Sequence, residues 1–184
     1  SNSKSLVRAK EGISIQINNV SVNKSIINGC SGDMFAYKES TVAQIPVTEI
    51  TNSTLIKPQG RIFYAGNAAS FSIDYCTMYG WGGSKAMLEL GDKNTLGMSL
   101  AIKNTILANG GSNRKAHNAN AAANLSLTIE KVYGTNDMTF HSTLGDVTKY
   151  DKPSTEVFEN PEEGNFKIID ALFPSSIGDP RWKE

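Results

Sequence analysis

The sequence has little that would cross-link the chain or bind a metal ion. Its 184 residues include two cysteines, Cys30 and Cys76, and neither stands in a metal-ligand pattern such as CxxC. Two thiols are too few for the disulfide framework of a small secreted scaffold. We therefore expect both thiols to be free and buried, and we expect no cofactor.

Net charge and long apolar runs are also missing. Eighteen basic residues balance eighteen acidic ones, and no basic cluster marks a nucleic-acid footprint. No apolar run approaches the roughly 18 residues of a membrane span. The first residues, SNSKSLVRAKEG, lack the apolar centre of a signal peptide and lead abruptly into the strand-like ISIQI. We expect no nucleic-acid partner, no membrane span and a further N-terminal domain in the natural chain.

What the sequence does have is a repeat. Five segments align on an apolar anchor residue, and successive anchors are 28, 23, 29 and 27 residues apart. The anchors are Val22, Ile50, Ile73, Ile102 and Ile129. A quasi-period in this range is typical of solenoids, and the chain length suits one domain.

The columns around the anchors follow strand geometry. The residues two before each anchor are mostly apolar or β-branched, so they share an inner face with the anchors; they are Val20, Thr48, Phe71, Leu100 and Leu127. Five residues after the anchors the chain points inward again, at Ile27, Leu55, Met78 and Leu107. Three residues after the anchors stand Ser25, Ser53, Cys76, Thr105 and Val132, which are small or β-branched.

A one-residue corner is expected between these strands. The corner column contains asparagine twice, and asparagine tolerates left-handed backbone angles; its members are Lys24, Asn52, Tyr75, Asn104 and Lys131. Further strands are predicted at MFAYK (34–38), RIFYAG (61–66) and AMLELG (86–91). Strands that recur once per coil stack in parallel, which predicts an all-β parallel β-helix of about five to six coils. A β-sandwich is the alternative, because it too is built from many short strands.

The pattern resembles the right-handed parallel β-helices of the pectin-lyase-like superfamily over about Ile13 to Phe140. VFENPEEGNFKI (157–168) is similar to a segment that closes many secreted bacterial β-helices. IGDPRW (177–182) looks like the ending of an uncharacterised family from polysaccharide-degrading gut bacteria. The resemblance implies an extracellular or cell-surface protein with a polysaccharide partner. We expect residues 1–141 to form the coils and residues 142–184 to form a C-terminal cap or tail of the same domain.

An outward ladder of charged residues is the candidate catalytic site. Asp74, Lys103 and Glu130 each follow an anchor, so parallel stacking places them about 4.8 Å apart in succession. Pectate-lyase-like enzymes carry their chemistry on such a face, with a basic residue as the base and Ca²⁺ held by carboxylates. Lys103 would then be the base, and Ca²⁺ is expected only under this alternative. Opposite charges on neighbouring strands also simply stabilise a sheet, and carboxylates would keep the lysine protonated.

Three aromatic residues are candidates for substrate binding. Tyr75, Tyr79 and Trp81 fall in DYCTMYGWGG, where flat rings beside one groove could stack on sugars. Because Gly80, Gly82 and Gly83 flank Trp81, we expect its indole to be at least partly exposed, whereas Cys76 and Met78 point into the core. His117 and His141 have no pattern of a catalytic triad and are interpreted as surface or cap residues.

Three functions remain open on this basis. The first hypothesis is an exported module that engages polysaccharide with little or no catalysis. A polysaccharide lyase or glycoside hydrolase using the ladder is the second, and a structural spacer of a larger surface protein is the third. Fold resemblance alone does not decide among them.

Overall fold

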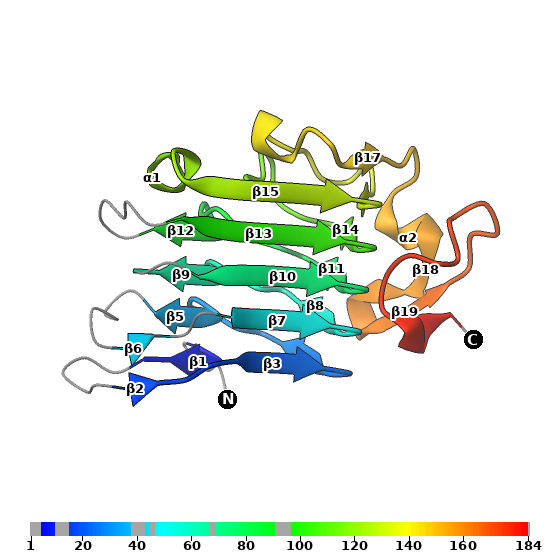
Figure 1. The fold of residues 1–184 in the computed structure, drawn as a ribbon. Coiled ribbons are helices and arrows are strands. Elements are labelled where there is room, and N and C mark those ends of the chain that lie inside the picture. The colour runs from blue at the N-terminus through cyan, green and yellow to red at the C-terminus, as the bar shows by residue number, and fades with distance from the viewer. Residues whose placement is uncertain are drawn as a thin grey trace.

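The molecule is a stack of coils whose strands lie one above another (Figure 1). The structure, a computed structural model, describes residues 5–9, 15–37, 43–44, 47–66, 69–90 and 97–183. Every strand pair between successive coils in this part of the chain is parallel, and the one antiparallel pair lies in the C-terminal segment. The predicted parallel β-helix is therefore confirmed, and the β-sandwich alternative is wrong.

The first sheet contains the five anchor strands. They are β3 (Val20–Asn23), β7 (Val47–Thr51), β10 (Ser70–Asp74), β13 (Met98–Lys103) and β15 (Leu125–Glu130), in the order β15-β13-β10-β7-β3. The register pairs Val22 with Ile50, Ile50 with Ile73, Ile73 with Ile102 and Ile102 with Ile129, as predicted. Ile50, Ile73 and Ile102 are fully buried, and Ile129 is half-buried in the last strand.

A single residue with left-handed angles turns each coil into the second sheet. The predicted corner residues Lys24, Asn52, Tyr75, Asn104 and Lys131 have φ values of 49°, 48°, 49°, 44° and 51°. The strands that follow these five corners are β4 (Ile26–Asn28), β8 (Thr54–Ile56), β11 (Thr77–Tyr79), β14 (Ile106–Ala108) and β16 (Tyr133–Gly134). A sixth strand, β17 (Thr148–Lys149), pairs with β16 and extends the sheet. Ile27, Leu55, Met78 and Leu107 pair in register, so the second inward column is confirmed.

The third sheet closes each coil. It contains β1 (Val7–Arg8), β5 (Phe35–Tyr37), β9 (Phe63–Ala65) and β12 (Leu88–Leu90). Three of them are the predicted strands, although Lys38 and Gly91 at the predicted ends lie outside the described residues. A short pair, β2 (Ile15–Gln16) and β6 (Ala43–Gln44), lies apart from these sheets. The three sheets contain four, five and six strands, so the described residues form about four complete turns, fewer than the five to six coils expected from the sequence.

The space between the three sheets is filled by apolar side chains. The rings of Phe35 and Phe63 lie 5.6 Å apart, and those of Phe63 and Phe71 lie 4.6 Å apart. Cys30 and Cys76 are free and buried, as expected. Burial raises the pKa of the Cys76 thiol to about 12, so this inward residue is protonated at neutral pH.

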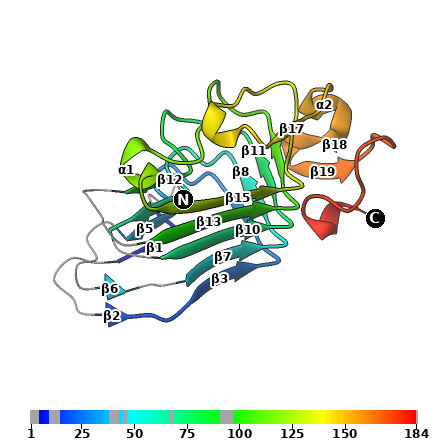
Figure 2. The ribbon, with the colours of Figure 1, turned by 45° about the horizontal axis from the view of Figure 1, so that its top comes forward.

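One end of the stack is covered by the chain that follows β15. Met138, Leu144 and Val147 are buried in the main core there, and a short 3₁₀ helix, η1 (Ser142–Leu144), lies over the last coil (Figure 2). A second short helix, α1 (Ala119–Ala122), lies beside β12 at the same end. The end of the core is thus closed by residues 138–147.

The rest of the C-terminal segment lies on the side of the stack, where Figure 1 shows it in orange and red. This strap, residues 153–183, contains α2 (Ser154–Val157), β18 (Phe158–Asn160), η2 (Pro161–Glu163), β19 (Asn165–Ile168) and η3 (Pro180–Trp182). Phe158, Phe166 and Phe173 pack against Tyr79 and Ile106 on the outer face of the second sheet. Of the C-terminal segment expected to cap the stack, residues 142–184, only the first part, up to residue 147, covers the end of the core. The strap lies on the side of the stack instead.

The IGDPRW motif fastens the strap to the coils. Thr54 Oγ1 donates to the buried Asp179 carboxylate at 2.7 Å, and Trp182 Nε1 donates to the same hydroxyl oxygen at 2.7 Å. Gly178 N–H donates to the Asn104 carbonyl at 2.8 Å with a φ of 87°, and a β-carbon there would meet Ile106 at 2.6 Å. The motif thus has a structural role in this fold.

Candidate functional site

The charged ladder forms on the outer face of the first sheet, as the register predicts. Asp74 pairs with Lys103, and Lys103 pairs with Glu130. Lys103 Nζ lies 3.2 Å from Glu130 Oε2, and both side chains are about half exposed. Asp74 Oδ1 instead accepts a hydrogen bond from Asn104 Nδ2 at 2.9 Å. The three groups therefore do not act as one unit, and an exposed ion pair of this kind contributes at most about 1 kcal/mol.

Tyr75 and Tyr79 lie in different surroundings. Tyr75 is 37% exposed at its corner, with Lys183 Nζ 5.6 Å from the centre of its ring. Tyr79 is fully buried beneath the strap, where its hydroxyl donates to Glu162 Oε1 at 2.5 Å and accepts from Asn109 Nδ2 at 2.7 Å. Burial and the Glu162 carboxylate raise the pKa of Tyr79 to about 12.

The expectation of an exposed Trp81 is wrong. The side chain is 1% exposed and belongs to the interior core. The glycines beside it allow neighbouring coils to approach closely, because a β-carbon on Gly83 would overlap the Gln59 carbonyl oxygen. Trp81 thus faces the interior, Tyr79 the strap and Tyr75 the solvent, and the three rings form no common platform.

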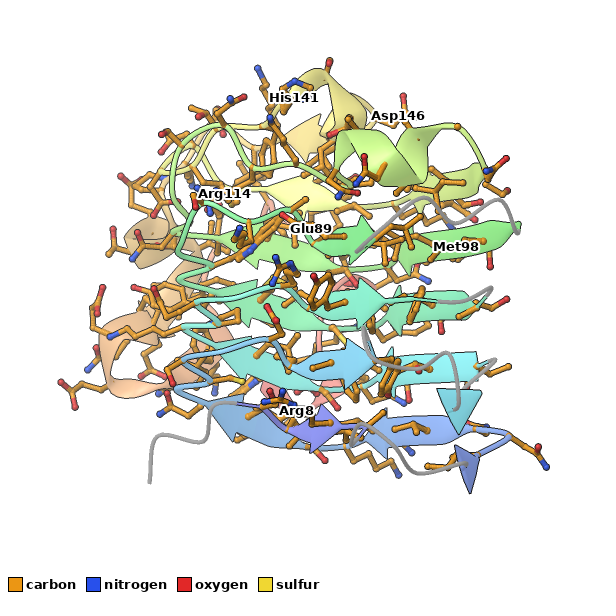
Figure 3. All side chains as sticks on the ribbon, turned by 90° about the vertical axis from the view of Figure 1, so that its left-hand side faces the viewer. Arg8, Glu89, Met98, Arg114, His141 and Asp146 are labelled. Atoms are coloured by element: carbon orange, nitrogen blue, oxygen red, sulfur yellow. The ribbon has the colours of Figure 1, made fainter. Side chains whose placement is uncertain are left out.

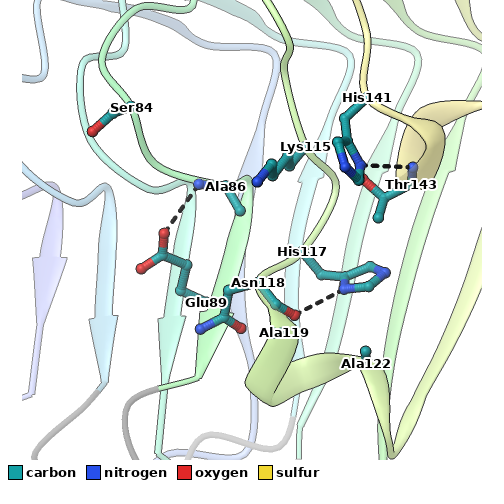
Figure 4. A pocket seen from close by; sticks show the side chains of 10 residues that line it. All are labelled: Ser84, Ala86, Glu89, Lys115, His117, Asn118, Ala119, Ala122, His141 and Thr143. Atoms are coloured by element: carbon teal, nitrogen blue, oxygen red, sulfur yellow. Dashed lines mark hydrogen bonds between the residues drawn. The ribbon is translucent and has the colours of Figure 1, made fainter.

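A pocket of about 390 Å³ lies beside the third sheet near the closed end (Figure 4). We call it the histidine pocket. Its polar lining consists of Ser84, Glu89, Lys115, His117, Asn118, His141 and Thr143. Alanines complete the wall, and Figure 3 shows Glu89 and His141 on the same side of the molecule, with Arg8 at the far end of that side.

Stacked segments bring these side chains together. Residue 117 pairs with Leu88 of β12, so the segment from Lys115 to His117 continues the third sheet by one level. Asn118 fixes α1 to this level, because its Oδ1 accepts from Ala121 N–H at 3.1 Å and its Nδ2 donates to Leu90 O at 3.1 Å. Thr143 Oγ1 accepts from Ala116 N–H at 3.1 Å, which holds the start of η1 above the pocket.

The hydrogen bonds assign the tautomers of the two histidines. His117 Nδ1 lies 2.9 Å from the Asn118 carbonyl oxygen, which can only accept, so Nδ1 carries a proton. His141 Nδ1 accepts from Thr143 N–H at 3.2 Å, so a neutral His141 carries its proton on Nε2. His141 therefore presents a donor, and His117 Nε2 is an acceptor that becomes a donor when the ring is protonated.

The interpretation of His117 and His141 as surface or cap residues did not identify the pocket that they share. No local motif connects them, but their separation of 24 residues falls within the 23 to 29 residues between anchors. That spacing places two residues one coil apart on the same side of the stack. The repeat itself therefore contained the signal that could have found this site.

A partly buried ion network extends from the pocket along the third sheet. Arg61 Nε donates to Glu89 Oε2 at 2.6 Å, and Arg61 Nη1 donates to Asp33 Oδ2 at 3.0 Å. The guanidinium lies 3.9 Å from the centre of the Tyr64 ring. Burial alone would lower the pKa of Arg61, but Glu89 and Asp33 raise it above its ordinary value. The outer face thus carries an aromatic and several charged groups over successive coils.

The fold defines the chain as a parallel β-helix protein with a side strap. Residues 71–182, more than half of the chain, match the family described as "Domain of unknown function (DUF5123)", and the chain belongs to this family. The match runs from β10 to η3, and it includes the ladder, β12, all the residues that line the histidine pocket, and the strap up to residue 182. No curated protein and no solved structure matches the sequence. Among the described residues, no helix is long and apolar enough to cross a membrane.

Proposed function

We propose that this domain is an exported module that binds polysaccharide through the histidine pocket and the adjoining outer face of the third sheet. The observation that carries the proposal is the convergence of Glu89, Lys115, His117, His141 and Thr143 on one open pocket. Binding sites for small polar groups combine a concave surface with a few well-placed hydrogen-bonding side chains. Sugar hydroxyls need such donors and acceptors.

The surface next to the pocket suits a chain-like ligand. Coils repeat about every 4.8 Å along the stack, so the third sheet offers equivalent positions at successive levels. Tyr64 lies in β9 of this sheet, and its ring is next to the Arg61 guanidinium. Its level in the stack is two levels before that of His117. A polymer lying along the axis could contact this aromatic residue and the pocket together.

The export part of the proposal is supported by the resemblance to secreted β-helices of the pectin-lyase-like superfamily. VFENPEEGNFKI and IGDPRW carry that resemblance, and both lie in the strap. The proposed location is therefore outside the cell or on the cell surface.

Binding is favoured over turnover by the state of the carboxylates. Glycoside hydrolysis needs two carboxyl groups flanking one bond. In the ladder, Glu130 pairs with Lys103 and Asp74 bonds Asn104, while Glu89 of the pocket is occupied by Arg61.

A binding panel with two sets of variants tests the proposal. Isothermal titration against soluble plant and host polysaccharides should show binding by the wild type without new reducing ends or unsaturated products. His117→Ala should weaken binding because it removes a pocket group, and Lys103→Ala should not, since Lys103 lies on the first sheet.

Two results would contradict this function. Loss of binding in Lys103→Ala with His117→Ala unaffected would move the site to the ladder. Turnover of any glycan that Lys103→Ala abolishes, with stability intact, would establish the enzyme alternative. An absence of binding across the panel would leave the spacer hypothesis.

A further inference from the structure

The histidine pocket contains a lysine without an ion-pair partner among the described residues. Lys115 is exposed and forms no ion pair with any residue that the structure describes. Glu89 is the one carboxylate among the described lining residues, and it is already engaged. Its Oε2 accepts from Arg61, and its Oε1 accepts from Ala86 N–H at 3.1 Å. Glu89 therefore forms its ion pair with Arg61 and not with Lys115.

A second cation is buried next to this wall. Arg114 precedes Lys115, is 8% exposed, and donates to the backbone carbonyl oxygens of Ser112, Gly82 and Gly83. No carboxylate in the described part of the chain pairs with it, and burial lowers its pKa. Gly83 adjoins Ser84 of the lining. Arg114 is thus a buried cation without a carboxylate partner in the described part of the chain, next in sequence to Lys115.

Neutral donors point to the same kind of ligand. His141 Nε2–H is a donor in the tautomer that the Thr143 N–H bond requires. Side-chain donors that surround a lysine are the usual partners of carboxylate and sulfate oxygens. Among the described residues no group of three His, Cys, Asp or Glu could hold a metal ion, so the geometry disfavours a cation.

We propose that the histidine pocket binds an oxyanion carried by the polysaccharide, with Lys115 as its ion-pair partner. The group is the carboxylate of a uronic acid or the sulfate ester of a sulfated sugar, which share this chemistry. The inference rests on the proposed function and specifies its ligand: acidic glycans bind, and neutral glycans bind more weakly.

Charge-matched variants test this inference in the full chain. Lys115→Gln removes the positive charge, Lys115→Arg retains it, and Lys103→Gln removes the same charge from the first sheet as the control. Each is titrated with polygalacturonate, dextran sulfate, neutral dextran and inorganic sulfate. Lys115→Gln should weaken binding of the preferred acidic glycan about tenfold, as expected for one charge-assisted hydrogen bond. Lys115→Arg and Lys103→Gln should stay within about twofold of the wild type.

The choice of ligands distinguishes a carboxylate from a sulfate ester, and it distinguishes failure of the oxyanion inference from failure of the proposed function. Preference for polygalacturonate identifies a carboxylate, and preference for dextran sulfate, which carries no carboxylate, identifies a sulfate ester. Equal binding of neutral and acidic glycans that Lys115→Gln leaves unchanged would overturn the oxyanion inference and leave the proposed function standing. Binding of inorganic sulfate that depends on Lys115, without binding of any glycan, would support an anion site and overturn the polysaccharide function.

Discussion

At the scale of single residues, the corners of the coils show how side chains connect one coil to the previous one. Asn52 Nδ2 donates to Asn23 Oδ1 at 3.0 Å, and Asn104 Nδ2 donates to Asp74 Oδ1 at 2.9 Å. Each bond joins a corner to the outward residue one coil earlier. Tyr75 occupies an equivalent corner with the same positive φ but has no amide to make this bond. The sequence is thus suboptimal at this position.

Replacing Tyr75 with asparagine should stabilise the protein by about 0.5 to 1 kcal/mol. Asparagine tolerates left-handed angles better than tyrosine, and its amide could reach Thr51 of the previous coil. The loss of the exposed contact with Lys183 offsets about 0.5 kcal/mol. Urea unfolding measures the difference, and Tyr75→Ala is the control that keeps the strain. An asparagine variant no more stable than the alanine variant would show that the corner geometry has no such effect.

Trp81 is a packing residue whose indole N–H has no hydrogen-bond partner among the described residues. The Arg114 guanidinium carbon lies 5.6 Å from the centre of its ring. The large side chain stabilises the core through burial, whereas its unpaired N–H opposes that effect. These two contributions can be separated by substitution.

Trp81→Ala should cost about 3 to 5 kcal/mol in the free energy of unfolding, because it leaves a cavity in a filled core. Trp81→Phe should cost less than half as much, since it retains most of the volume and removes the unpaired donor. Chemical denaturation followed by circular dichroism measures both. A cost below about 1 kcal/mol for the alanine variant would mean that the ring is exposed in solution.

At the scale of elements, the strap packs on the second sheet through apolar side chains, and polar groups attach it at two places. One attachment is Asp179, described above, and the other is Asp170. Asp170 accepts from the Tyr150 hydroxyl at 2.6 Å and from Leu172 N–H at 3.1 Å, and it pairs with Lys152 at 2.9 Å. The Tyr150 hydrogen bond and Lys152 lower the pKa of Asp170 to about 2. Tyr150 also packs edge-on against Phe173 of the strap. Charge on Asp170 therefore supports the attachment of the strap.

Acid should weaken this attachment. The pKa of Asp170 is lower in the folded chain than the value of about 4 expected when unfolded, so its contribution is present above about pH 4 and is lost as the pH falls toward 2. Urea midpoints measured between about pH 5 and pH 2.5 should fall less steeply in Asp170→Asn than in the wild type. Asp146→Asn, which changes an exposed carboxylate, is the control and should keep the wild-type slope. Equal slopes in all three proteins would contradict the role of Asp170.

At the scale of the whole molecule, the coils differ in how many neighbours they have. β7, β10 and β13 each lie between two paired strands of the first sheet, whereas β3 pairs only with β7 in the described part of the chain. Val20 and Val22 are correspondingly half-buried, while Ile73 is fully buried. In a solenoid, stability is a sum over coils and the interfaces between neighbours. The central coils should therefore open least often.

Hydrogen exchange should show this gradient. Amides of peptides that cover β10 and β11 should exchange at least about tenfold more slowly than those that cover β3 and β4, because opening a central coil breaks two interfaces. Mass spectrometry of the exchanged peptides measures the rates. Uniform protection from β3 to β13 would mean that the stack opens only as one cooperative unit.

The sequence by itself determined the coil architecture. Each coil repeats the same inward columns, and a shift of one residue would turn every inner side chain outward, so Val22, Ile50, Ile73, Ile102 and Ile129 could pair in one register only. The corner residues were predictable for the same local reason, because one left-handed residue between two strands has few suitable side chains. Local periodicity and backbone preference were sufficient for this part of the structure.

Only the tertiary structure decided which segments cover the coils and which side chains come together in the histidine pocket. Glycines around Trp81 suggested exposure, yet Gln59 of the previous coil packs against them and the indole is buried. The strap binds the side of the stack through Thr54 and Asp179, which are 125 residues apart. His117 and His141 meet only when two coils are placed one above the other. These contacts depend on which distant surfaces fit together, and strand periodicity contains no information about that fit.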